Sequence, residues 1–170
     1  MANLVLVRSA GVFLVNARPY ESGDLEGVIE TYTASIHSLA ASYYSPEQLA
    51  AWAPALPDSA QWQRRLAALH TLVAESDAVL AGFASYTEEG YLDFLFTHPR
   101  FARRGVASLL YQAVESALRS LGVPQVMSHV SLAARPFFDR QGFVVAAEEC
   151  VECRGVFLRR FTMHKVLGEK

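Results

Sequence analysis

The sequence predicts an α/β (α+β) fold with helices on both faces of a mixed, mostly antiparallel central sheet. The chain has 170 residues, of which 52% are hydrophobic and 19% charged, enough for one full core. Apolar residues recur at helical spacing in some segments and form strand-like runs in others. The predicted order is β, α, α, α, β, β, β, α, β, α, β, β, which mixes both element types. We expect residues 1–170 to form a single domain.

The chain opens with a predicted strand over residues 12–17 and a long amphipathic helix. Ser22 or Asp24 can cap this helix, and an acidic residue there also favours the helix dipole. Its apolar face follows helical spacing through Leu25, Val28, Ile29, Tyr32, Ile36 and Leu39.

Two shorter helices follow. The first has Ser45 as its cap and Pro46 at its first position, and Pro54 and Pro57 end it. The second of these two helices covers residues 59–69. Three strand-like runs come next, over residues 71–75, 79–86 and 91–97.

The second half opens with a helix that begins after Gly105 and carries an apolar stripe. Gly122 and Pro124 end this helix. A strand over 125–130 and a short helix over 133–141 follow. Residues 143–151 and 156–165 are typical of a closing hairpin that turns at Arg154-Gly155.

The composition disfavours several function classes. The net charge is −2, and the cluster Arg100, Arg103 and Arg104 is local, which suits a small phosphorylated ligand better than nucleic acid. No apolar run has the length of a membrane span. Residues 1–8 lack the charged-then-apolar order of a signal peptide. We therefore expect a cytoplasmic protein without a membrane or nucleic-acid partner.

The two cysteines, Cys150 and Cys153, have C-x-x-C spacing. A zinc site needs a second pair or histidines at ligand spacing, and a redox C-x-x-C normally opens a helix. This pair lies in strand-like sequence, so we expect ordinary reduced thiols and no metal.

A basic, glycine-containing turn joins the strand 91–97 to the helix after it. First-turn N–H groups have no partner within a helix and carry positive character, which favours a phosphate ligand. Gly105 permits close approach to the backbone, and the guanidinium groups offer forked donors. The candidate phosphate-binding residues are Arg103, Arg104, Gly105, Val106, Ala107 and Ser108.

This junction resembles the GNAT superfamily of acyl-CoA-dependent N-acyltransferases, whose pattern there is Gln/Arg-x-x-Gly-x-Gly/Ala. Gly105 and Ala107 match its last two fixed positions, and Ala102 departs from the first. Residues 134–143 resemble the family's Ala-x-x-Phe-Tyr-x-x-x-Gly-Phe, and the order of elements matches over residues 12–165. Residues 44–54 are similar to the bacterial YafP-like subgroup.

The resemblance implies that acetyl-CoA binds in a cleft between the strands 91–97 and 125–130. The backbone near Phe96 and Thr97 would hold the pantetheine arm as an added strand would. Ser131 lies where the family often has Asn. Phe138 lies where it usually has Tyr, and its ring can pack against the thioester.

Acyl transfer to an amine requires the amine to lose a proton. A lysine-like amine is neutral in about one part in a thousand at pH 7, a cost of roughly 4 kcal/mol. Asp93 is the candidate base, since the resemblance puts the family's carboxylate on this strand. Regular alternation would place Tyr91, Asp93 and Leu95 on one face. A solvated Asp93, or one that orients the amine, is the alternative.

The proton donor to the leaving thiolate stays open, because Phe138 has no hydroxyl. A tyrosine from elsewhere, His129 or water can take this role. The tyrosines considered are Tyr44, Tyr86 and Tyr91.

The acceptor site is expected from the first helices. Tyr44, Gln48 and Trp52 recur at helical spacing and would form an aromatic wall or pack on the core. His37 can join either. Tyr91 completes the candidate acceptor residues.

We therefore predict an N-acetyltransferase that moves an acetyl group from acetyl-CoA directly to a primary amine of a small molecule or peptide. A non-catalytic acyl-CoA-binding or sensing module is the alternative. Monomer and homodimer both stay open, since Cys150, Phe157 and Phe161 on the hairpin look exposed in the pattern.

Overall fold

The computed structural model describes residues 4–6 and 15–168, and it has two antiparallel sheets. The first has the order β1-β2-β3-β4-β5, and the second has the order β6-β8-β7. The strands of the first sheet are β1 (Leu4–Leu6), β2 (Val15–Pro19), β3 (His70–Ser76), β4 (Val79–Tyr86) and β5 (Leu92–Thr97). Those of the second are β6 (Gln125–Ser131), β7 (Val144–Cys153) and β8 (Val156–Val166).

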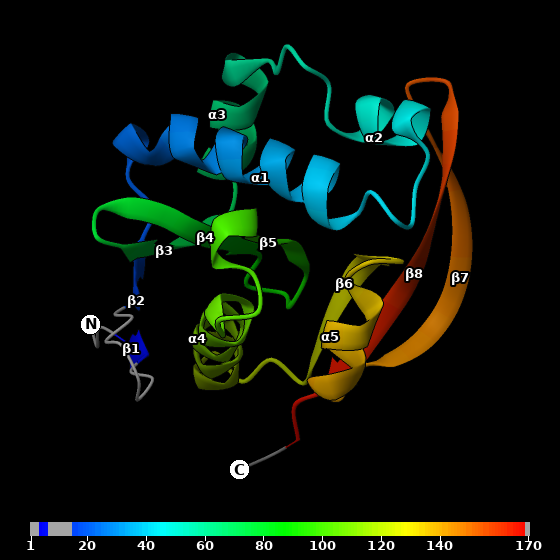
Figure 1. Cartoon of the computed structure of the whole chain (residues 1–170). Coiled ribbons are helices and arrows are strands. Elements are labelled where there is room, and N and C mark those ends of the chain that lie inside the picture. The colour runs from blue at the N-terminus through cyan, green and yellow to red at the C-terminus, as the bar shows by residue number, and fades with distance from the viewer. Residues whose placement is uncertain (1–3, 7–14, 169–170) are drawn as a thin grey trace.

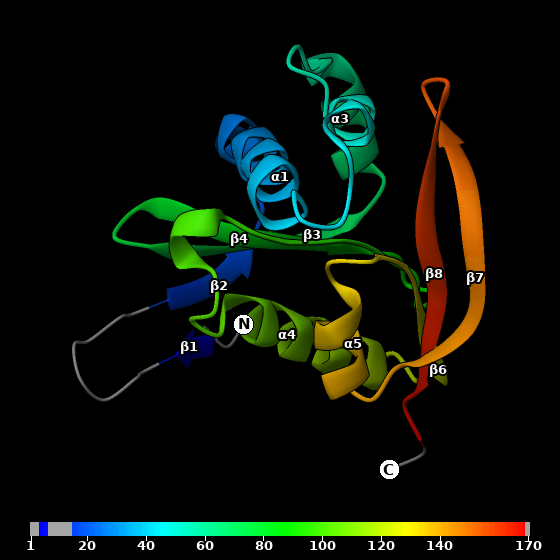
Figure 2. The same cartoon turned by 45° about the vertical axis from the view of Figure 1, so that its right-hand side comes forward.

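Helices cover both faces of the first sheet, as expected. Figures 1 and 2 show α1, α2 and α3 above this sheet, α4 below it, and α5 beside α4 next to β6. The helices are α1 (Leu25–Leu39), α2 (Pro46–Trp52), α3 (Ser59–Ala67), α4 (Val106–Ser120) and α5 (Arg135–Arg140). Two short 3₁₀ turns, Ser22–Asp24 and Pro99–Phe101, precede α1 and α4.

The predicted elements are present, with differences at their ends. Of the strand predicted over 12–17, the described part belongs to β2, and residues 12–14 lie outside the described residues. The strand β1 is not in the prediction. The turn Arg154-Gly155 has positive φ at both residues, 49° and 79°, which suits the tight hairpin.

The two helix starts differ in how they are capped. Ser45 caps α2 as predicted, with its side chain accepting from the Gln48 N–H at 3.2 Å. Asp24 occupies the cap position of α1 but makes no cap bond to it. Its carboxylate accepts instead from both terminal nitrogens of Arg18 at 2.8 Å, because that guanidinium offers a charged, bidentate partner.

Each face of the first sheet carries its own apolar layer. The α4 side buries Leu109, Leu110 and Val114 with residues of β4 and β6, and the α1 side buries Val28 against Phe83. Burial of such side chains stabilises each layer by about 1.5–3 kcal/mol per residue. The sheet is thereby held rigid between two helical layers.

The two sheets meet at the start of β5 and then separate. In the described part of the chain, the β5–β6 pairing is a single parallel bridge, Tyr91–Met127. Gly90, at φ 95°, lies so close to this junction that an added Cβ would come within 2.4 Å of the Gln125 carbonyl oxygen. Beyond a bond from the Ser128 hydroxyl to the Leu92 carbonyl, the strands diverge and leave a gap.

Strand β5 contains a bulge at Asp93. Tyr86 pairs with Leu92 and the preceding Ser85 pairs with Phe94, so Asp93 is the extra residue. Leu92 therefore packs on the α4 side, whereas Phe94 packs on the α1 side. The regular alternation predicted for this strand is wrong at this point, because the extra residue shifts it by one.

The tip of the β7–β8 hairpin reaches α2 (Figure 1). Gln48 donates to the Phe157 carbonyl at 2.8 Å, and Arg154 donates to the Ala51 carbonyl at 2.6 Å. The sequence pattern suggested that Phe157 and Phe161 are both exposed. Phe157 is exposed, whereas Phe161 belongs to the hydrophobic core on the α4 side of the first sheet.

Candidate active site

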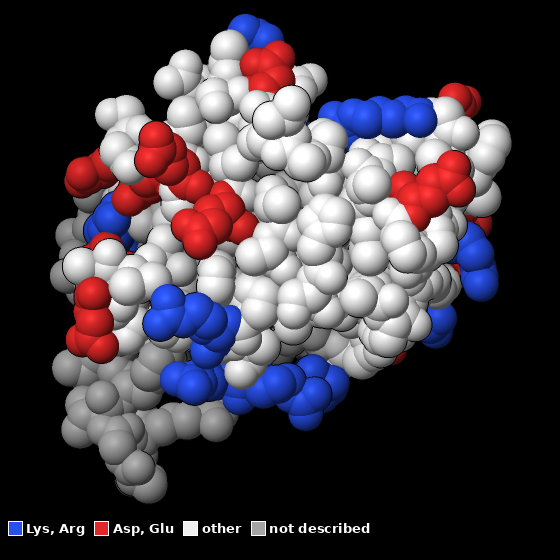
Figure 3. All heavy atoms as spheres, turned by 45° about the horizontal axis from the view of Figure 1, so that its top comes forward, with Lys and Arg blue, Asp and Glu red and all other residues white. Residues whose placement is uncertain are grey.

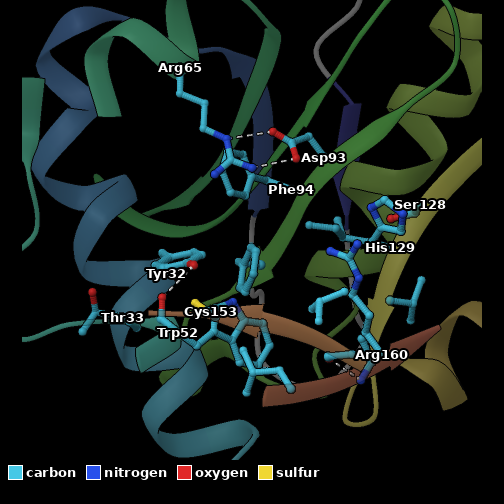
Figure 4. Close-up of a pocket in the computed structure, with 18 of the residues that line it drawn as sticks. Tyr32, Thr33, Trp52, Arg65, Asp93, Phe94, Ser128, His129, Cys153 and Arg160 are labelled. Atoms are coloured by element: carbon cyan, nitrogen blue, oxygen red, sulfur yellow. Dashed lines mark hydrogen bonds and ion pairs between the residues drawn. The ribbon is translucent and has the colours of Figure 1, made fainter. Parts of the chain in front are cut away.

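A cavity of about 560 Å³ lies where the two sheets separate (Figure 4). Such a volume is typical of small-molecule sites. Side chains from α1, α3, both diverging strands, α5 and the hairpin line it. The cavity is therefore assembled from segments that are far apart in the sequence.

Asp93 lies on this cavity and is paired with Arg65 of α3. The Arg65 Nε and Nη2 donate to the two carboxylate oxygens at 3.0 and 2.8 Å. The guanidinium also lies 4.2 Å from the centre of the Phe94 ring. The Asp93 side chain is 12% exposed, so the pair is only partly solvated. Each carboxylate oxygen keeps one lone pair for a ligand.

Aromatic rings form one wall of the cavity. The Tyr32 ring contacts Trp62 and Phe96, each at 4.8 Å between centroids, and Trp62 stacks on Phe94 at 5.2 Å. The Tyr32 hydroxyl donates to the Trp52 carbonyl, and burial raises the pKa of Tyr32 to about 12. This wall presents an apolar, uncharged surface.

A tyrosine–histidine pair lies at the apex of the gap. The Tyr91 hydroxyl is 2.9 Å from His129 Nδ1, and both residues line the cavity. Burial raises the pKa of Tyr91, and the nearby Asp93 carboxylate adds to this. Burial and the positive charge of Arg160 lower the pKa of His129. At neutral pH the two residues are therefore uncharged.

The predicted cofactor residues fall into two groups. Phe96, Ser131 and Phe138 line the cavity, whereas Thr97 lies at the end of β5, opposite Gly82. The Ser131 hydroxyl accepts from the Ala134 N–H at 3.1 Å, and the Phe138 ring packs edge-on against Phe143.

The second group forms the turn into α4. Arg103 has φ 62° and Gly105 has φ 91°, and both values lie in the left-handed region. Gly105 is the N-cap and supplies no side-chain cap to the helix. The first intrahelical bond runs from the Leu109 N–H to the Gly105 carbonyl, so the amides of 106–108 have no acceptor within the helix. Arg103 and Arg104 are exposed.

The structure changes the role of the predicted acceptor residue Tyr44. Tyr44 precedes the cap of α2 and is not part of the helical face predicted with Trp52. Its hydroxyl donates to the Arg159 carbonyl at 2.7 Å and accepts from the Leu132 N–H at 2.9 Å. Tyr44 and Trp52 both line the cavity, and the centroids of their rings are 5.4 Å apart. His37 instead bonds to the Ala53 carbonyl.

Several lining residues are not in the prediction. Arg65, Trp62 and the hairpin residues 151–154 reach the cavity only through the tertiary fold. Cys153 is among them, and its thiol donates to the Ala51 carbonyl at 3.3 Å. Asp93 could be singled out because it is an acidic residue inside an apolar strand, but no comparable signal in the sequence marked Arg65.

Cys150 and Cys153 are free thiols. Among the residues that the structure describes, no group of three or more His, Cys, Asp or Glu side chains is placed to hold a metal ion. Within the same residues, no helix is both long and apolar enough to cross a membrane. On the face shown in Figure 3, Lys and Arg gather along the lower margin and acidic side chains gather at the left.

The model of the family described as "Acetyltransferase (GNAT) domain" matches residues 40–166. The chain is also 35% identical over 149 residues to a protein of Escherichia coli strain K12 named "Uncharacterized N-acetyltransferase YafP". This match covers 88% of the chain and 94% of the relative.

Solved structures share the fold. A GCN5-related N-acetyltransferase from Rhodopseudomonas palustris matches with a TM-score of 0.86 and 31% identity, over 98% of this chain and 99% of that one. A putative acetyltransferase, YncA, from Salmonella typhimurium, solved with acetyl-CoA, matches with a TM-score of 0.67 and 19% identity, over 92% and 95% of the two chains.

Proposed function

Because this chain belongs to the GNAT family of acetyltransferases, we propose that it moves an acetyl group from acetyl-CoA directly to a primary amine. The resemblance to the YafP-like subgroup expected from residues 44–54 is confirmed by the identity to YafP. The assignment as an acyltransferase follows from the family, whereas the primary amine and the direct transfer are our proposal.

The gap between β5 and β6 is the observation that carries this proposal. Among the described residues, one edge of β5 has no strand partner beyond the bridge at Tyr91, so its backbone groups near Phe96 and Thr97 can bind an extended pantetheine arm. The structure of YncA was solved with acetyl-CoA, and its fold is the same. The turn 103–108 would take the pyrophosphate through its first-turn amides and its arginines.

Asp93 enters the proposal in one of the two roles that its sequence position left open. Both Asp93 oxygens already accept hydrogen bonds from the Arg65 guanidinium, which fixes the carboxylate in place and suits it to positioning a ligand. The free lone pairs still attract an ammonium or amine N–H. We therefore propose that Asp93 holds the acceptor amine beside the thioester, with Tyr91 and Trp52 as walls of the acceptor site.

Phe138 favours a second candidate, a module that binds acyl-CoA without turnover. The side chain at this position has no proton to give, and it is 4% exposed in an apolar setting. This candidate predicts cofactor binding with no amine-dependent release of CoA.

Isothermal titration of the purified protein with acetyl-CoA, with ATP as the control, tests the cofactor site. We expect micromolar affinity for acetyl-CoA and none for ATP. Release of free CoA is then measured with a panel of amines, comprising alkylamines, amino acids, peptide N-termini and lysine peptides. Amine-dependent release supports the enzyme, and binding without release supports the sensing module. Failure to bind acetyl-CoA contradicts both.

The remaining expectations stay predictions from the sequence. They are a single domain over 1–170, a cytoplasmic location, and a small-molecule or peptide acceptor with no nucleic-acid or membrane partner. The choice between monomer and homodimer also stays open.

A further inference from the structure

The Tyr91–His129 pair lies where the chemistry of the proposed function needs a proton carrier. Tyr91 lies just before β5 and His129 lies in β6, and both residues line the cavity, where His129 is labelled in Figure 4. Asp93, two residues from Tyr91, is bound to Arg65, and Phe138 has no acidic proton. The pair therefore combines a hydroxyl and an imidazole beside the amine-holding carboxylate.

The surroundings of His129 favour one arrangement of its protons. Its Nε2 faces the Glu149 carboxylate at 4.0 Å, and a carboxylate favours an N–H on that side. Nδ1 is then the acceptor, and the Tyr91 O–H donates to it at 2.9 Å. With its proton directed at His129, the Tyr91 oxygen has lone pairs free toward the cavity.

Glu149 is itself held in place from β8. The Arg160 Nε donates to one carboxylate oxygen at 3.0 Å, and the Thr162 hydroxyl donates to the other at 2.7 Å. The charged and titratable groups that face His129 are thus Tyr91 just before β5, Asp93 of β5, Glu149 of β7 and Arg160 of β8.

We propose, building on the proposed function, that Tyr91 and His129 form a relay that carries the proton from the attacking amine nitrogen to the leaving CoA sulfur. Tyr91 is the catalytic residue of the relay, because it lines the cavity in which the amine and the thioester would meet. His129 is its positioning residue and stores the proton.

The relay balances the reaction without a further reactant. The amine nitrogen attacks the thioester carbon, and an N–H proton passes to the Tyr91 oxygen while the Tyr91 proton passes to His129 Nδ1. The C–S bond then breaks, and its electron pair stays on sulfur. The imidazolium returns its proton to Tyr91, which gives its own to the thiolate. The products are the amide and free CoA.

The electrostatics fit a relay better than a lone acid or base. Burial raises the pKa of Tyr91, so a lasting tyrosinate is disfavoured and the residue passes a proton on. Burial and Arg160 lower the pKa of His129, so the imidazole is neutral and ready to accept. The Glu149 carboxylate stabilises the imidazolium while the proton is held.

The first test needs no acceptor. We expect ¹⁵N–¹H NMR of the resting protein to show His129 as the neutral tautomer with the proton on Nε2. In Tyr91→Phe the Nδ1 resonance should shift toward that of an imidazole nitrogen without a hydrogen bond. A proton on Nδ1 in the wild type would overturn the relay.

The second test uses the panel amine that the wild type turns over fastest. His129→Gln keeps a hydrogen-bonding side chain but cannot store a proton, and we expect kcat to fall about 100-fold. The KM for acetyl-CoA should stay within about twofold, since the cofactor site is intact. In the wild type, kcat/KM should fall as the pH drops through the pKa of His129, which lies below the usual 6.5 of histidine. The His129→Gln variant should lose this acidic limb of the pH profile.

Two further variants complete the test. Tyr91→Phe should slow turnover as much as His129→Gln, and the double variant should be no slower than the slower single one, because the residues act as a unit. His70→Gln, at a half-exposed histidine outside the cavity, is the matched control and should keep the wild-type rate and pH profile. An unchanged acidic limb in His129→Gln overturns the relay alone. Lack of wild-type turnover with every amine contradicts the proposed function itself.

Discussion

The turn at 103–108 and the cavity between the sheets differ in how they are built. The turn is one continuous segment whose candidate binding groups are backbone amides and neighbouring arginines. The cavity is formed by side chains from α1, α3, β5, β6 and the hairpin. The first is set by local geometry, and the second by long-range contacts. A local site can thus be identified from a motif, whereas an assembled site needs the fold.

The strongest test of the local site is Gly105→Glu. This change puts a negative charge at the helix N-terminus and a side chain at φ 91°, so we expect acetyl-CoA affinity to fall at least about 100-fold. Gly122→Glu is the matched control, because Gly122 also has positive φ, 73°, with open space around it. Titration of both variants decides the matter. Wild-type affinity in Gly105→Glu would remove the turn from the cofactor site.

Tyr44→Phe tests the assembled site. It removes the hydroxyl that joins β8 to the segment before α5, and leaves the Arg159 carbonyl and the Leu132 N–H without this partner. We expect a loss of about 2 kcal/mol in the free energy of unfolding, measured by urea denaturation. Tyr43→Phe, at a side chain that is 48% exposed, should change it by less than about 0.5 kcal/mol. Equal losses in the two variants would contradict the structural role of Tyr44.

Asp93→Asn has the smallest expected effect and separates two roles. If Asp93 holds the amine, the KM for the amine should rise about tenfold with a smaller change in kcat. Asp139→Asn is the control, because Asp139 also faces an arginine, Arg135, but lies outside the cavity. Steady-state CoA release gives both constants. A fall in kcat at constant KM would instead make Asp93 the base.

Much of the fold follows from sequence periodicity, because its long helices and strands have clear apolar patterns. The α4 stripe and the Ser45-Pro46 start of α2 are examples. The bulge at Asp93 does not follow, since one extra residue leaves the pattern of apolar side chains almost unchanged. The prediction that Asp24 caps α1 was wrong, because Arg18, six residues earlier, offers that carboxylate a charged, bidentate partner.

The same distinction applies to the site. The turn was proposed as part of the site from its motif, and Asp93, Phe96 and Phe138, which line the cavity, were proposed with the help of the family resemblance. The pairing of Asp93 with Arg65 joins positions 28 residues apart, and that of Tyr91 with His129 joins positions 38 apart. Neither pairing has a spacing rule in the sequence, because each depends on how two elements meet.

The separation of β5 from β6 also bears on aggregation. An unpaired strand edge is a template on which other chains can add and aggregate, and proteins usually protect it with charges, prolines or a covering segment. Here two such edges face each other across the gap inside the molecule, between the helices above and α5 below (Figure 2). A foreign β-sheet cannot reach them without parting the two sheets. The slender pantetheine arm of the proposed function needs no such parting, so the arrangement on which that proposed binding depends also protects the edge from misassembly.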